Sequence, residues 1–290
     1  MDLPMDNIRS PKRLYTDLVR IRVGETYDVY RAVTTMDTKE RSVTVKVVGD
    51  PSLNDFADNE FGVLTRLKKG VADASNAIQL MFPEPIELFE IKDHATIVTD
   101  FAPAHFTLAR IREIYPNGVP PEHVAWMFNR IVMGAMEAHT NGVVHGRLLP
   151  RNVLIHSGKH WKVDPFVHTA VLIDWTCAAT ETSQNVWPKI GGVSEEFEKF
   201  YPSEALNGHP VSPQTDLAMA ANCAIYLLGG DVASGDAYSK APTGMADLLR
   251  TCRDPNPSRR PRDLGEFYRQ FQAMLVSYFG KPRFVELPLW

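Results

Sequence analysis

The stretch Val144-His145-Gly146-Arg147-Leu148-Leu149-Pro150-Arg151-Asn152-Val153-Leu154-Ile155 joins a polar loop to a run of branched apolar residues. The run after Asn152 favours a short buried strand. A second apolar run, Ala170–Ile173, ends in Asp174-Trp175-Thr176. The sequence thus predicts a loop and two short strands with His145, Asn152 and Asp174 at their ends. By itself, the first stretch is equally compatible with an ordinary turn followed by a strand.

Both segments resemble conserved motifs of the protein kinase superfamily. The first is similar to the catalytic loop H-R-D-L-K-P-x-N-V-L-I, and it matches at His145, Leu148, Pro150 and Asn152. Arg147 stands where the family has its aspartate, five positions before the asparagine. Asp174-Trp175-Thr176 stands where kinases carry D-F-G.

Further matches follow in the order that the family requires. Val43-Thr44-Val45-Lys46 resembles the V-A-I-K strand, and Glu60 lies on the next predicted helix, where the resemblance implies a glutamate that holds the lysine. Tyr201–Leu206, followed by Asp216, resembles the A-P-E segment and the aspartate that opens a buried helix. Several ordered motifs are far more specific than one.

A last match lies near the C-terminus. Asp254-Pro255-Asn256-Pro257-Ser258-Arg259-Arg260-Pro261 resembles the D-P-x-x-R-P element. The resemblance implies an ion pair between Arg260 and Glu204.

The resemblance, together with the order of predicted elements, implies an α+β, bilobal protein kinase-like fold with a small β-rich N-lobe, one helix in that lobe, and a larger helical C-lobe. Strands are predicted between residues 18 and 48, and again in PIELFEI and ATIVTDF. Helices are predicted at 54–69, in the stretch 120–142 that opens with proline and closes with an Asn-Gly cap, at 216–228 and at 264–279. We expect an N-terminal tail at 1–16, the N-lobe at 17–100, the C-lobe at 101–276 and a C-terminal tail at 277–290.

The resemblance also implies ATP and Mg²⁺ as ligands. Thr99 stands at the gatekeeper position, and the backbone of Asp100 and Ala102 is expected to face the adenine edge. Asn152 and Asp174 are the expected metal ligands. The expected nucleotide-binding residues are Gly24, Val29, Lys46, Glu60, Thr99, Asp100, Ala102 and Leu154.

The sequence departs from the family where phosphate transfer is carried out. Arg147 cannot accept a proton, because a guanidinium has no acceptor and stays charged, although it is a candidate phosphate ligand. Leu149 replaces the loop lysine that neutralises the transferring phosphoryl group. In the Gly-rich loop only Gly24 is kept, with Arg22 and Tyr27 at the other two glycine positions.

Three further substitutions lie beside these motifs. Gly146 replaces an arginine that often reads a phosphate on the activation segment, so we do not expect that kind of switching. Trp175 and Thr176 replace the phenylalanine and glycine of D-F-G.

Because no catalytic residue is intact at positions 147 and 149, we interpret the chain as a pseudokinase that acts as a scaffold or allosteric partner, with ATP as a stabilising ligand. One alternative is a slow or atypical Ser/Thr kinase whose base is another carboxylate. Another is a relative of aminoglycoside and choline kinases, which also have H-G-x-L-x-x-x-N and I-D-W segments.

Composition supports neither a nucleic-acid nor a membrane partner. The net charge is −4, and no apolar run approaches the ~18 residues that a membrane span needs. Three widely separated cysteines indicate a reducing, cytoplasmic environment.

Between Asn152 and Asp174, an insert carries Trp161 and Phe166. It also holds three irregularly spaced histidines, which favours a solvated loop or protein contact over a metal site: His156, His160 and His168.

Overall fold

The computed structural model describes residues 7–102, 105–156, 169–184, 186–237, 240–281, 283 and 285–289. The chain falls into two compact units. The first is made of Met1–Lys69 with Pro83–Pro103, and the second of Gly70–Phe82 with Ala104–Trp290.

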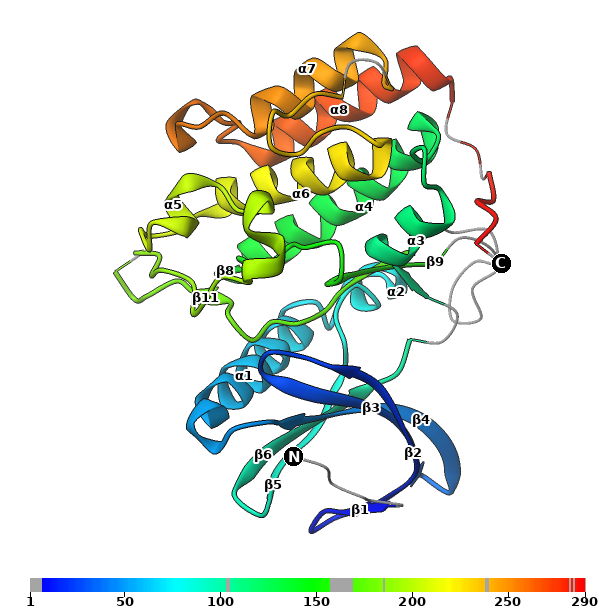
Figure 1. The fold of residues 1–290 in the computed structure, drawn as a ribbon, viewed down its shortest axis with the longest axis vertical. Helices are drawn as coiled ribbons and strands as arrows, with labels where there is room; N and C mark the ends of the chain where they lie inside the picture. Colours follow the sequence, from blue (N-terminus) through cyan, green and yellow to red (C-terminus); the bar gives the residue numbers. More distant parts are fainter. Residues whose placement is uncertain are drawn as a thin grey trace. The chain divides into compact units, whose positions relative to one another are not determined.

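An antiparallel sheet of six strands, in the order β1-β2-β3-β4-β6-β5, builds the first unit (Figure 1). The strands are β1 (Asn7–Arg9), β2 (Leu14–Val23), β3 (Tyr27–Met36), β4 (Lys39–Val48), β5 (Pro85–Ile91) and β6 (His94–Asp100). The short helix η1 (Pro51–Leu53) and helix α1 (Asn54–Gly70) lie between β4 and β5 in sequence.

Both faces of this sheet are packed, because the central strands carry apolar side chains on alternate sides. On one face, Tyr27, Val48 and Ile97 form a cluster with Ala57 of α1. The other face buries Ile8, Tyr15, Tyr30, Ala32, Val43, Val45, Val47, Phe89 and Val98. The helix therefore covers one side only, and the hairpin of β1 and β2 contributes to the other.

The prediction of a loose tail at residues 1–16 is wrong from residue 7 onward. Residues 7–9 pair with residues 14–16 in an antiparallel hairpin. Ile8 and Tyr15 are 2% and 0% exposed, and the Tyr15 hydroxyl donates a hydrogen bond of 2.7 Å to Glu87 of β5. The sheet thus begins at Asn7, eleven residues before the first predicted strand at residue 18.

The second unit is mostly helical (Figure 1). Its helices are α2 (Asn76–Gln79), α3 (Leu108–Ile114), α4 (Pro121–Thr140), η2 (Glu195–Phe200), α5 (Ser203–Leu206), α6 (Pro213–Leu228), α7 (Thr243–Cys252), η3 (Pro257–Arg259) and α8 (Leu264–Phe279). Its strands are β7 (Phe106–Thr107), β8 (Val143–Val144), β9 (Val153–His156), β10 (Thr169–Leu172) and β11 (Ala179–Thr180).

Helix α6 is buried on nearly every side, as its sequence predicts. Helix α4 packs beside α8 through aromatic side chains, with the ring of Phe128 centred 5.0 Å from that of Phe271. The predicted strands at 153–156 and 170–172 pair as the antiparallel hairpin of β9 and β10. The insert residues 157–168, with Trp161, Phe166, His160 and His168, lie outside the described residues.

The predicted C-terminal tail packs onto the second unit over part of its length. Helix α8 continues to Phe279, three residues beyond the expected lobe boundary. After it, Leu287 and Leu289 are buried, and the Tyr115 hydroxyl donates a hydrogen bond of 2.7 Å to the carbonyl of Pro288. No helix in the described part of the chain has the length and apolar character to cross a membrane.

Candidate functional site

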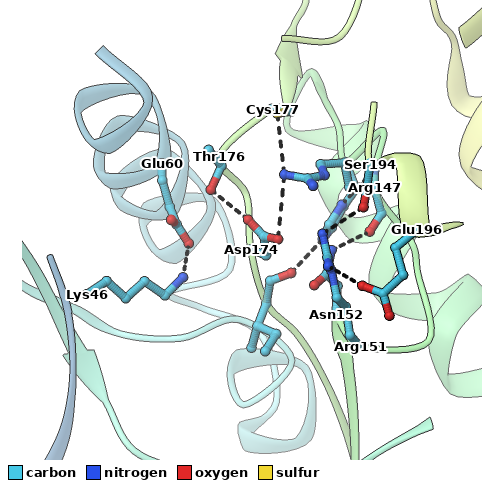
Figure 2. Close-up of polar contacts among 12 residues, drawn as sticks. Lys46, Glu60, Arg147, Arg151, Asn152, Asp174, Thr176, Cys177, Ser194 and Glu196 are labelled. Atoms are coloured by element: carbon cyan, nitrogen blue, oxygen red, sulfur yellow. Dashed lines mark hydrogen bonds and ion pairs between the residues drawn. The ribbon is translucent and has the colours of Figure 1, made fainter. Parts of the chain in front are cut away.

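In the first unit, Lys46 and Glu60 form the ion pair that the sequence predicts. Lys46 lies on β4 opposite Val29 of β3, and Glu60 lies on the buried face of α1. The Lys46 Nζ is 2.6 Å from the Glu60 Oε1, and the two side chains are 10% and 1% exposed (Figure 2). The short distance and the burial make this a strong, charge-assisted hydrogen bond within the unit.

The turn between β2 and β3 is tight and is closed by a backbone hydrogen bond. The Gly24 amide donates a hydrogen bond of 2.9 Å to the Tyr27 carbonyl. A Cβ on Gly24 would lie 2.9 Å from that carbonyl oxygen and 3.0 Å from the Arg22 guanidinium. The ring of Tyr27 instead lies 5.4 Å from the Lys46 ammonium, a cation–π distance. The tyrosine at the third glycine position therefore packs against the lysine.

The expected hinge residues lie at the end of β6 and just beyond it. Thr99 is 3% exposed and lies opposite Thr44 of β4. The Asp100 side chain accepts a hydrogen bond of 2.7 Å from the amide of Glu84. Ala102 lies half-buried beyond the strand. Their contact with adenine stays a prediction.

In the second unit, Asp216 fixes the backbone of the loop that resembles the catalytic loop. Its carboxylate is fully buried in the first turn of α6 and accepts hydrogen bonds of 2.8 Å from the amides of His145 and Gly146. A third contact of 2.8 Å joins it to the Nε2 of His139 at the end of α4. Two helices thereby hold one loop through a single side chain.

His145 is neutral in this setting. Its Nε2 lies 3.1 Å from the Ile173 carbonyl and its Nδ1 accepts from the Arg147 amide at 3.2 Å, so the proton is on Nε2. Complete burial lowers the pKa of His145. The ring also packs 4.3 Å from Trp175. The histidine therefore joins the loop to the segment before Asp174.

Gly146 is required by the backbone and by its neighbour. Its φ is +69°, a region that favours glycine, and a Cβ would lie 2.2 Å from the Cγ2 of Ile190. Gly146 stands where kinases often have an arginine. In this chain a side chain at that position would collide with Ile190.

Arg147 turns its guanidinium toward Asp174 (Figure 2). Its Nη1 is 3.8 Å from the Asp174 Oδ2 and donates to the Cys177 Sγ at 3.7 Å, and the side chain is 5% exposed. Burial lowers the pKa of Arg147, but Asp174, Cys177 and Tyr201 raise it by more, so the pKa lies above its ordinary value. Arg147 is a permanent cation here.

The second oxygen of Asp174 is engaged as well. The Thr176 hydroxyl donates to the Asp174 Oδ1 at 2.6 Å, the shape of a local turn between an aspartate and a threonine two residues later. Asp174 has a φ of +66°, which aspartate tolerates better than most residues.

Asn152 offers an oxygen suited to a cation. Its Nδ2 donates to the Arg147 carbonyl at 3.0 Å, while its buried Oδ1 has no hydrogen-bond partner among the residues that the structure describes. An amide oxygen is an acceptable Mg²⁺ ligand. The two expected ligands therefore suit Mg²⁺ unequally, because the Asn152 Oδ1 is available and Asp174 already faces the cation of Arg147.

The remaining predicted residues play structural parts in the same unit. The Leu149 side chain is fully buried, and Leu154 pairs with Thr107 and Val171 within the small sheet. Sequence reasoning missed Cys177, the hydroxyl bond of Thr176 and the link from His139 to Asp216. Of these, the Asp-x-Thr spacing alone carried a readable signal.

The predicted ion pair between Glu204 and Arg260 is confirmed. The guanidinium bonds both carboxylate oxygens, at 2.5 and 3.1 Å, and the Arg260 side chain is 0% exposed. The Thr215 hydroxyl donates to the same carboxylate at 3.0 Å. This pair ties the segment before α6 to the one before α8.

Comparison with solved structures shows the fold. The kinase domain of Mycobacterium tuberculosis PknI superposes with a TM-score of 0.62 at 17% identity, covering 93% of this chain and 98% of that domain. A double mutant of the same domain gives 0.61 at 18% identity, over 95% and 100%. No protein family model matches the sequence. No curated protein matches it either. The chain therefore has the bilobal kinase-like fold: an N-terminal antiparallel sheet with a helix, then a helical part.

Proposed function

We propose that the chain is a pseudokinase, a kinase-fold protein that binds a nucleotide weakly and acts through a protein partner without transferring phosphate. The observation that carries the proposal is the state of Arg147. At the position of the base stands a buried cation that faces Asp174 at 3.8 Å. A guanidinium has no lone pair to accept a substrate proton.

The expected loss is large but finite for the base alone. Removing a general base costs about 10²–10⁴-fold, against typical kinase rates of about 1–100 s⁻¹. Leu149 adds to this, because a buried leucine supplies no charge to the transferring phosphoryl group. Both losses fall on the chemical step.

Nucleotide binding is supported by the first unit. The buried pair of Lys46 and Glu60 has the form that contacts phosphates in kinases. Weak affinity is expected, since the turn at Gly24 is tight and Tyr27 packs against the lysine. The net charge of −4 gives no reason to propose a nucleic-acid partner.

Phosphate transfer is measured with radiolabelled ATP, on the protein itself, on generic protein substrates and on small aminoalcohols. We expect no transfer above background. Robust transfer that disappears in Asp174→Ala would refute the pseudokinase and indicate an atypical kinase. Transfer to the aminoalcohols alone would point to a small-molecule kinase.

ATP binding is measured by thermal unfolding. A ligand at 100 times its Kd stabilises the fold by about 2.7 kcal/mol. Lys46→Met should remove the shift, each variant being compared with its own melting temperature. Lys68→Met is the matched control, because this lysine of α1 pairs at 2.9 Å with the exposed Glu84 and should keep the shift. An unchanged melting temperature of the wild type up to millimolar ATP would contradict nucleotide binding.

A further inference from the structure

We propose that the guanidinium of Arg147 replaces the magnesium ion at Asp174, so that the chain takes its nucleotide as a metal-free polyphosphate. The nucleotide part rests on the proposed function, whereas the exclusion of the metal rests on the second unit alone.

The charge of Asp174 is already balanced from within the chain. The Arg147 Nη1 approaches the Oδ2 at 3.8 Å, and the two side chains are 5% and 11% exposed. Their burial limits screening by water and salt, so the pairing is stronger than an exposed one. A divalent cation bound to the same carboxylate would lie next to this guanidinium and be repelled by it.

Coordination at the other oxygen is also hindered. The Thr176 hydroxyl donates to the Asp174 Oδ1 at 2.6 Å and occupies an acceptor site there. Magnesium demands near-octahedral geometry at about 2.0–2.1 Å from its oxygen ligands. The hydroxyl would have to turn away before an ion could bind in that position.

Asn152 by itself does not make a metal site. Its Oδ1 has no hydrogen-bond partner among the described residues, but it is a single neutral oxygen. Its Nδ2 donates a hydrogen bond of 3.0 Å to the Arg147 carbonyl, which holds the amide group in one orientation. The described residues hold no group of three His, Cys, Asp or Glu side chains that could bind a metal ion instead.

An arginine can bind and neutralise the phosphate oxygens that the magnesium ion would otherwise bind. Its planar guanidinium binds phosphate oxygens through paired N–H donors. A guanidinium is not deprotonated in proteins, so this charge is present at every accessible pH. What it cannot supply is the acceptance of the substrate proton that a base provides, in keeping with binding without turnover.

The first test uses the wild type and ATP. Thermal shifts are recorded in EDTA and in excess Mg²⁺, and equal shifts are expected. A shift that appears only with Mg²⁺ would overturn the proposal. If ATP gives no shift in either buffer, nucleotide binding fails, and the metal exclusion is decided by the second test.

The second test measures Mn²⁺ binding in the absence of nucleotide, by loss of the free-ion EPR signal. Arg147→Gln should bind Mn²⁺ about 10- to 100-fold more tightly than wild type, the range typical of changes around a metal site. The gain should vanish in Arg147→Gln/Asp174→Asn. Arg151→Gln is the matched control, since this arginine bonds Glu196 and Ser194 at 3.0 Å and should gain nothing (Figure 2).

Arg147→Lys covers the case in which the glutamine variant does not fold. It keeps a cation beside Asp174 and should gain no Mn²⁺ binding. Wild-type protein that binds Mn²⁺ as tightly as Arg147→Gln, and loses it in Asp174→Asn, would refute the replacement.

Discussion

Replacing Arg260 by alanine should destabilise the protein strongly, because its guanidinium serves four acceptors. It bonds both oxygens of Glu204, the Asp254 carbonyl at 2.8 Å and the Gln214 carbonyl at 3.2 Å. Without it, the buried Glu204 carboxylate keeps the hydroxyl of Thr215. Removing one partner of a buried pair costs about 3–5 kcal/mol.

This loss is measurable as a melting temperature. For a domain of 150–250 residues, 1 kcal/mol corresponds to about 2–4 °C, which gives a decrease of roughly 6–20 °C. The assay is differential scanning calorimetry, supported by circular dichroism at 25 °C to show that the variant is folded. Arg250→Ala is the control, because its pair with Asp247 is more than half exposed on both sides. Exposed pairs contribute about 0–1 kcal/mol.

A double-mutant cycle with Glu204→Gln separates the pair from packing. We expect the two changes to be strongly non-additive, since residues in contact share their energy. Equal melting of Arg260→Ala and Arg250→Ala would refute the assignment of the C-terminal motif and the burial on which the magnitude rests.

Three further outcomes are expected in unfolding experiments. Gly146→Ala should cost more than the roughly 1–2 kcal/mol of the left-handed conformation. Gly208→Ala, with φ +65° and open space around it, should cost no more than that, and equal costs would contradict the close packing at Gly146. Burial lowers the pKa of His145, so below about pH 6.5 the unfolded chain takes up a proton that the folded one refuses. As the pH is lowered through this range, the free energy of unfolding should fall by up to about 1.4 kcal/mol per pH unit. If His145→Gln shows the same dependence of stability on pH, His145 is not its cause. Lys46→Met should cost about 3–5 kcal/mol, most of it regained in Lys46→Met/Glu60→Leu. No recovery in the double variant would mean that packing, not charge, sets the cost.

The fold could be predicted because its motifs occur in a fixed order and most long elements have a clear period. The helix at 264–279 was found with the boundaries that the structure has, and the helix predicted in the stretch 120–142, caps included, spans Pro121–Thr140. The hairpin at 7–16 was missed because β1 is three residues long and its single buried side chain, Ile8, gives no alternation to recognise. Helix α3, Leu108–Ile114, is too short for a helical period to stand out.

Part of the candidate site could be predicted. The contacts of Arg147 and Tyr27 could not, because they depend on the direction that each side chain takes. Motif positions specified the partners of Lys46 and Arg260, where the family spacing fixes both ends. They did not reveal where a long arginine at position 147 would turn, because that depends on Cys177 and Asp174, which come from another segment. Nor could spacing show that Tyr27 would lie over Lys46.

The bonds of Asp216 have a consequence for protein engineering. The amides of His145 and Gly146 are held by a carboxylate that comes from α6, not by the side chain of residue 147. The path of the main chain and the reactivity of the loop are therefore separate properties, each open to change without the other. Variants of position 147 that fold therefore compare acids, amides and amines while Asp216 continues to hold the amides of His145 and Gly146.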